Sequence, residues 1–115
     1  MKIYLATPVN GRKEKTLEAK QHAALKRVEE MKVYLRNRFQ GASFKSSFDF
    51  VDPGEEIDES VIMGHCICTV MECDMIVLDD GWENSNGCTV ERFVAMQYGK
   101  KVQTMNYFLM KDKIG

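Results

Sequence analysis

Glu91 is the residue whose type and setting most clearly suggest chemistry. It lies just inside an expected helix, after a loop of small polar residues, in the stretch GWENSNGCTVERFVA (residues 81–95). A carboxylate kept ionised by a helix N-terminus can attack the anomeric carbon of a sugar, and the free amides of the loop can hold a phosphate or a hydroxyl. The alternative is local, since an acidic residue in the first helical turn stabilises a helix by about 0.3–1 kcal/mol.

Other polar residues fall where strands are expected to end. They are Thr7-Pro8, Asp52, Asp79-Asp80 and Asn106. In parallel α/β sheets, ligands bind outside the carboxyl ends of the strands. Asp79 and Asp80 therefore either hold a ribose hydroxyl or form a solvated turn, and Trp82 either covers a base or packs the loop.

Alternating strand and helix patterns supply the elements that position these residues. Apolar spacing predicts helices over 13–40, 58–71 and 88–98, and strands over 2–8, 47–56, 75–78 and 101–108. The apolar run MIVL, residues 75–78, is typical of a central strand covered on both faces. The order predicts one α/β domain over residues 1–115, with a mostly parallel sheet of four or five strands.

Composition argues against several classes of protein. Sixteen Lys and Arg against 17 Asp and Glu give a net charge of −1, without a basic block suited to nucleic acid. No run approaches the roughly 20 apolar residues of a membrane span, and no glycine-rich phosphate loop is present. The four cysteines are expected to be reduced thiols of a cytoplasmic protein. Cys66 and Cys68 lie about 160° apart on a helix, which does not suit a tetrahedral metal site. No cofactor is expected.

Two stretches together resemble the nucleoside 2-deoxyribosyltransferase superfamily. They are KIYLATP…GR at the start and ECDMIVLDDGWENSNGCTVERFVAMQYGKKV (residues 72–102). The second contains CD-x-I…GW-x-x-S-x-G-x-x-x-E, a signature similar to that of a branch of small bacterial and phage proteins. The superfamily also includes 2-deoxynucleoside 5-phosphate N-hydrolases. The resemblance covers most of the chain and implies a flavodoxin-like, Rossmann-like three-layer sandwich, usually a homodimer or larger homo-oligomer.

The resemblance also assigns roles to residues. The position of Glu91 is the nucleophile that forms a covalent glycosyl-enzyme, and Tyr4 hydrogen-bonds that carboxylate. Ser85 stands where the transferases have an aspartate and the nucleotide hydrolases a serine at the 5-phosphate, which favours a 5-phosphorylated substrate or simple hydrolysis. Together with the position of the loop and the strand ends, this predicts a substrate site formed by Thr7, Asp80, Trp82, Ser85, Asn86 and Gly87. Asn106 is a weaker candidate, as a residue that completes the pocket of a partner subunit.

The sequence departs from the superfamily at the second acid. A carboxylate that assists the departing base is normal two turns before the CD pair, but Cys66 stands there, with no Asp or Glu between Glu59 and Glu72. His65 is adjacent, yet neighbouring helix residues point about 100° apart. The superfamily's E-x-G is also replaced, with Phe93 at the glycine position.

The presence of Glu91 and Tyr4, together with the absence of the second acid, leaves two possible functions. The first is cleavage of the N-glycosidic bond of a nucleoside or nucleoside 5-monophosphate, by hydrolysis or by transfer. The second is a catalytically silent module that binds a nucleotide or nucleotide sugar.

Overall fold

The computed structural model describes residues 1–114 and contains a four-stranded, all-parallel sheet in the order β2-β1-β3-β4. The strands are β1 (Lys2–Ala6), β2 (Ser43–Lys45), β3 (Met75–Leu78) and β4 (Lys101–Thr104). The α-helices are α1 (Leu17–Arg36), α2 (Glu59–Glu72), α3 (Asn86–Gln97) and α4 (Met105–Ile114). Two short 3₁₀ helices, η1 (Ser47–Asp49) and η2 (Trp82–Asn84), lie in the connections.

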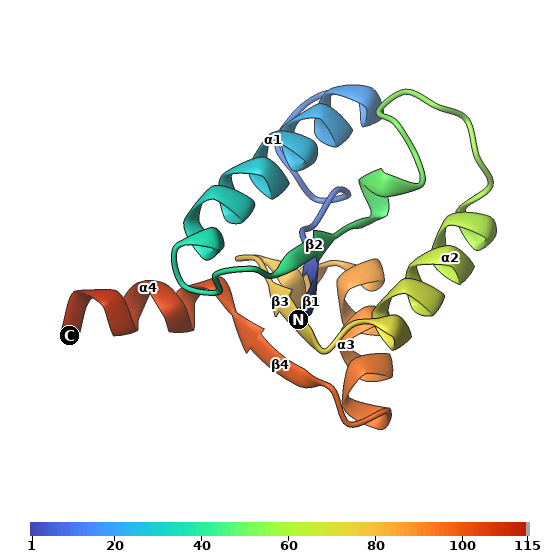
Figure 1. The fold of residues 1–115 in the computed structure, drawn as a ribbon. Helices are drawn as coiled ribbons and strands as arrows, with labels where there is room; N and C mark the ends of the chain where they lie inside the picture. The colour runs from blue at the N-terminus through green and yellow to red at the C-terminus, as the bar shows by residue number, and fades with distance from the viewer. Residues whose placement is uncertain (115) are drawn as a thin grey trace.

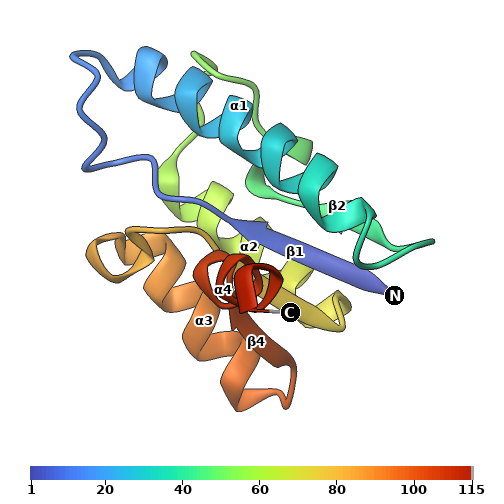
Figure 2. The same ribbon diagram turned by 90° about the vertical axis from the view of Figure 1, so that its left-hand side faces the viewer.

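Helices cover both faces of the sheet and make three layers (Figures 1 and 2). Because successive strand residues face opposite ways, Ile3 and Leu5 of β1 pack with α1 and α4. Tyr4 and Ala6 face the opposite layer, formed by α2 and α3. The fold is thus the expected α/β sandwich of flavodoxin-like type, and Tyr4 enters the same layer as Glu91.

The strand order reverses between β1 and β3, which creates the switch point where ligands bind in such sheets. Ala6 pairs with Leu78 at that end, and the Asp79 amide donates to the Ala6 carbonyl at 2.9 Å. At the other end, the Asp74 carboxylate accepts from the Lys2 amide at 2.7 Å, which ties the start of β1 to the residue before β3.

The first helix is shorter than predicted. It begins after Thr16, whose hydroxyl accepts from the Ala19 amide, rather than at Lys13. It ends at Arg36 rather than Gln40, and the chain reverses through Gly41 at a φ of 80°. Hydrophobic spacing extends the predicted helix into a segment of turns, in which the amides of Arg38 and Phe39 both donate to the Leu35 carbonyl before the chain leaves the helix.

The second strand was placed wrongly. Strand β2 is Ser43–Lys45, and SFD of the predicted strand forms η1 instead. Ser46 caps η1 reciprocally, accepting from the Phe48 amide while its own amide donates to Asp49. This capping box bends the chain away from the sheet, so Phe48 and Val51 are free to form part of a cavity wall.

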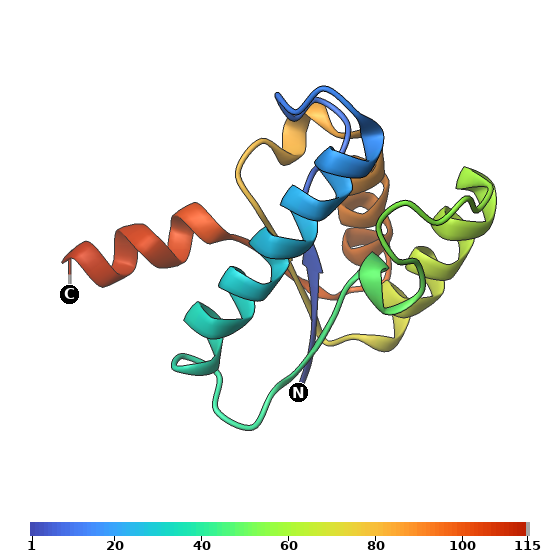
Figure 3. The same cartoon turned by 90° about the horizontal axis from the view of Figure 1, so that it is seen from above.

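The last strand ends earlier than predicted, at Thr104, because MNYF begins α4. The Thr104 hydroxyl accepts from the Tyr107 amide at 3.1 Å, as a helix cap does. Met105 and Phe108, three residues apart, then pack together into the core, while the rest of α4 extends away from the sheet (Figure 3).

Among residues 1–114, no helix combines the length and apolar character needed to cross a membrane.

Candidate active site

Glu91 and Tyr4 form a buried pair between α3 and β1. The Tyr4 hydroxyl donates a short hydrogen bond to Oε2 of Glu91, and Glu91 is only 5% exposed. Glu91 is the sixth residue of α3, which begins at Asn86, so it lies outside the first turn. The helix-start explanation of this glutamate is therefore wrong, because dipole stabilisation is confined to the terminal turn.

Burial gives Glu91 an unusual affinity for a proton. Desolvation raises its pKa to about 7, and hydrogen bonding with Tyr4 and Cys66 opposes the rise without cancelling it. Burial and the charge of Glu91 also raise the pKa of Tyr4, which therefore keeps its proton to donate. The expectation that the helix N-terminus holds Glu91 ionised is wrong. The carboxyl group instead exchanges its proton near neutral pH, as a catalytic carboxyl does.

The raised pKa of Glu91 predicts a pH dependence of folding. The folded state holds a proton on Glu91 that the unfolded chain loses near its ordinary pKa of 4.5. This contribution to stability is therefore complete below that value and is lost as pH rises through about 7. We expect a Glu91→Gln variant to gain stability over the wild type between pH 5 and pH 8, by up to about 3 kcal/mol. Urea unfolding of both proteins at the two pH values measures this, and a constant difference would contradict it.

Cys66 of α2 lies beside this pair. It is buried, and desolvation raises the pKa of its thiol to about 11, with further influence from Tyr4 and Glu91. At neutral pH it stays a thiol and is a weak proton donor. His65 cannot take its place, because its ring is exposed and stacks on Phe50 with the ring centroids 4.1 Å apart.

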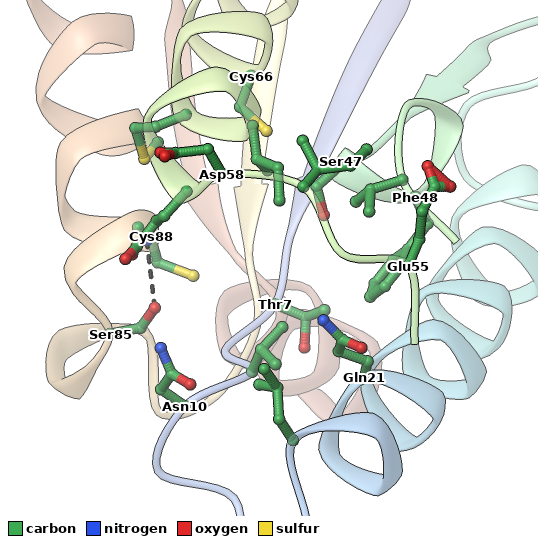
Figure 4. Close-up of a pocket in the computed structure, with 18 of the residues that line it drawn as sticks. Thr7, Asn10, Gln21, Ser47, Phe48, Glu55, Asp58, Cys66, Ser85 and Cys88 are labelled. Atoms are coloured by element: carbon green, nitrogen blue, oxygen red, sulfur yellow. Dashed lines mark hydrogen bonds between the residues drawn. The ribbon is translucent and has the colours of Figure 1, made fainter. Parts of the chain in front are cut away.

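A cavity of about 890 Å³ opens in front of Glu91 and Cys66. Its walls come from the loop after β1, the start of α1, the segment 47–59, α2 and the start of α3 (Figure 4). The segment 47–59 is tied to α1, since the Gly54 amide donates to the Gln21 side chain at 2.8 Å. This volume is typical of a small-molecule site.

Three predicted substrate-binding residues line this cavity: Thr7, Ser85 and Gly87. Ser85 is the N-cap of α3, and its Oγ accepts from the Cys88 amide at 3.3 Å (Figure 4). Its hydroxyl hydrogen remains available to a ligand oxygen.

The other predicted binding residues lie elsewhere. Asn86 is exposed and is not part of the cavity lining. Asp80 and Trp82 border a separate hollow of about 200 Å³, together with Asn106. Trp82 is also covered by Arg92, whose guanidinium carbon lies 5.0 Å from the ring centroid. The structure thus brings together Tyr4, Thr7, Ser85, Gly87 and Glu91, and places the remaining three apart.

An ion pair that the sequence did not reveal supports the floor of the site. Arg27 of α1 binds both oxygens of Asp79, with N–O distances of 2.9–3.1 Å, and Thr7 donates to the same carboxylate at 3.0 Å. Asp79 is therefore buried and paired, neither in a solvated turn nor free to bind a ribose. Arg12 donates to the Thr7 hydroxyl and to the Pro8 carbonyl, which holds the loop after β1.

The remaining candidates take no part in the cavity chemistry. Phe93 is 60% exposed and points away from the core, so replacement of glycine there leaves the cavity unchanged. Burial raises the pKa of Cys88 to about 12, so this thiol at the start of α3 is not a reactive nucleophile. Within residues 1–114, no three His, Cys, Asp or Glu side chains gather in a way that could hold a metal ion.

The chain is similar to a solved structure and to a family of domains. A conserved protein from Enterococcus faecalis V583 has a solved structure that matches with a TM-score of 0.66 at 20% identity, which shows a shared fold. The match covers 90% of this chain, and this chain spans only 61% of that protein. No curated protein matches the sequence. The model of the family DUF4406, a domain of unknown function, matches residues 1–104, and the chain therefore belongs to the DUF4406 family.

Proposed function

We propose that this protein cleaves the N-glycosidic bond of a nucleoside or nucleoside 5′-monophosphate, with Glu91 as the nucleophile. The observation that carries the proposal is the buried Glu91 carboxyl group, held by Tyr4 at the wall of a ligand-sized cavity. The resemblance to nucleoside 2-deoxyribosyltransferases supports it, because it assigns the same two residues the same two roles.

The reaction would proceed in two steps. An oxygen of ionised Glu91 attacks C1′ of the sugar, and the C1′–N bond breaks with its electron pair passing to the base. Tyr4 fixes the carboxylate through its hydrogen bond to Oε2. Water then releases the sugar in a hydrolysis, or a second base takes it in a transfer. Ser85 and Gly87 line the same cavity and would contact sugar or phosphate oxygens. Thr7 also lines it, and because its hydroxyl hydrogen goes to Asp79 it would only accept from a sugar hydroxyl.

The resemblance also implies that the protein assembles with copies of itself. A homodimer or larger homo-oligomer would allow Asp80, Trp82 and Asn106 to contribute to a neighbouring subunit's cavity. They border one hollow of this chain and so lie close to one another.

A second function is favoured by one specific observation. Cys66 stands where an assisting acid is expected, and its thiol, with a pKa of about 11, donates a proton poorly near neutral pH. The alternative is therefore a module that binds a nucleotide or nucleotide sugar without turning it over.

Release of free base from a panel of nucleosides and nucleoside 5′-monophosphates tests the proposal. We expect the wild type to release base from at least one member and a Glu91→Ala variant to release none. Absence of release from every member, combined with thermal stabilisation by a nucleotide, would support the binding module instead. Absence of both would contradict both functions.

A further inference from the structure

The charged side chains that line the cavity are all acidic. Six carboxyl-bearing residues line it: Glu18, Glu55, Glu56, Asp58, Glu59 and Glu91. None of the lining residues within 1–114 is a lysine, arginine or histidine. Apart from Glu91, these acidic side chains are exposed. A dianionic phosphate entering the cavity would therefore meet negative charge on most sides.

Arg12 supplies a positive charge close to the acidic lining of the cavity. It lies near enough for its charge to act on Cys88, which lines the cavity. Its guanidinium, however, donates to Thr7 and to the Pro8 carbonyl, and Arg12 is not itself part of the lining. Because Arg12 is already hydrogen-bonded and lies outside the lining, its single positive charge does not balance the acidic residues of the cavity.

The lining also lacks a proton donor beside the nucleophile. Cys66 is the titratable side chain of α2 that lies next to Glu91 within the cavity, and it is a buried thiol. Asp58 starts the same helix, but hydrogen bonds from Ser60 lower its pKa, so its carboxylate holds no proton to give. A neutral base leaving from C1′ would depart as an anion, which is slow without an acid.

We propose, on the basis of the proposed function, that the substrates are nucleosides whose base carries a fixed positive charge and whose sugar carries no phosphate. The base is bonded to the sugar through a quaternised ring, such as a pyridinium or an N-alkylated purine.

For such a substrate, cleavage balances without an acid. Glu91 forms a bond to C1′, and the electron pair of the C1′–N bond neutralises the ring, which leaves as a neutral base. Water then displaces Glu91 from C1′, and its proton passes to the solvent. The net reaction consumes one water and releases one proton for each cation cleaved, whereas a neutral nucleoside releases none.

The walls also suit a cationic ring. Phe48 lines the cavity together with Val51, Ile57, Ile62 and Met63. A flat cation gains from an aromatic face and from apolar contact, and the carboxylates at the rim supply the opposite charge. Recognition and leaving-group chemistry thus point to the same class of substrate.

Matched pairs of nucleosides test this inference. We expect kcat/KM for 7-methylguanosine to exceed that for guanosine by about 10²-fold or more. This is the smallest rate factor that a general acid usually contributes, and only guanosine needs that acid. We also expect 7-methylguanosine 5′-monophosphate to be cleaved more slowly than the nucleoside. Nicotinamide riboside, a pyridinium whose ring carries no ionisable N–H, should release one proton for each turnover. Similar kcat/KM for the neutral nucleoside, or faster cleavage of the monophosphate, would overturn the inference and leave the proposed function intact.

Equilibrium binding separates recognition from the reactivity of the substrate. In a Glu91→Gln variant, which cannot turn over, calorimetry should show tighter binding of 7-methylguanosine than of guanosine. Equal binding would overturn the inference. Preference for the cation in binding, without cleavage of any nucleoside by the wild type, would reject the proposed function while retaining the recognition of charge.

A paired variant locates the recognition at the rim. Glu55→Gln combined with Glu56→Gln should raise KM for 7-methylguanosine about three- to tenfold, because two exposed charge interactions are lost. The control combines Glu29→Gln with Glu30→Gln, an adjacent pair on α1 that is also exposed and lies outside the lining. An equal effect of both double variants would contradict recognition by this rim.

Discussion

Replacement of Glu91 by glutamine is expected to reduce base release at pH 8 by at least about 10³-fold, as removal of a nucleophile does in other enzymes. Glutamine has the same shape and can still accept the Tyr4 hydrogen bond through its carbonyl, but it cannot form a glycosyl ester with C1′. At pH 8 the wild-type carboxyl group, with a pKa of about 7, is mostly ionised and ready to attack. Release of base, followed by chromatography under single-turnover and steady-state conditions, measures the loss.

Two controls make this result specific to the nucleophile. Glu72→Gln neutralises an exposed carboxylate on α2 outside the cavity and should leave release unchanged. A nucleoside with fluorine at C2′ should slow the second step, so that intact-protein mass spectrometry detects the sugar on Glu91. Wild-type-like release by Glu91→Gln would rule out the assigned nucleophile. Loss of release without any adduct would instead assign Glu91 to activation of water.

Much of the fold could be predicted, because the buried strands carry continuous apolar runs. Residues 75–78 form β3 as predicted, and the alternation of strands and helices gave the parallel sheet correctly. The errors lie where a hydroxyl cap decides the conformation. Ser46 caps the residues SFD, predicted as strand, into η1, and Thr104 caps α4 at residues that were also predicted as strand. A local side-chain hydrogen bond outweighs β propensity there, and periodicity does not register it.

The candidate site was predictable only in part. The Tyr4–Glu91 contact joins residues 87 apart and followed from the resemblance, since spacing along the chain cannot indicate it. The bond of Arg27 to Asp79 gave no signal, because a single arginine on a charged helix face is ordinary. The raised pKa of Glu91 was missed because it results from burial, which depends on α2 closing over α3. Asp80 and Trp82 follow a buried strand as expected, yet the turn at Gly81, with a φ of 83°, leads them to a separate hollow.

Introduction of an acid at Cys66 is expected to produce the largest gain in rate. Cys66→Asp places a carboxyl group on α2 beside Glu91, within the same cavity. Two neighbouring buried carboxyl groups do not both ionise readily, so the new group should hold a proton while Glu91 attacks. We expect kcat/KM for neutral nucleosides to rise by about 10²-fold or more, since general acid catalysis contributes about 10²–10⁴. The pH profile should become bell-shaped, falling at low pH as Glu91 is protonated and at high pH as the new acid ionises.

A control variant shows whether a gain in Cys66→Asp comes from proton donation or from the changed shape of the side chain. Cys66→Asn has nearly the same volume as Cys66→Asp and no proton of suitable acidity, so it should give no gain and no alkaline limb. Quaternised nucleosides provide the opposite control, because their bases leave without a proton. Their kcat/KM should stay unchanged or fall in Cys66→Asp, while that for neutral nucleosides rises. An equal gain for both classes would mean that Cys66 limits binding or shape rather than proton donation. A gain confined to neutral nucleosides would show that the thiol at this position is what restricts the wild type to substrates that need no acid.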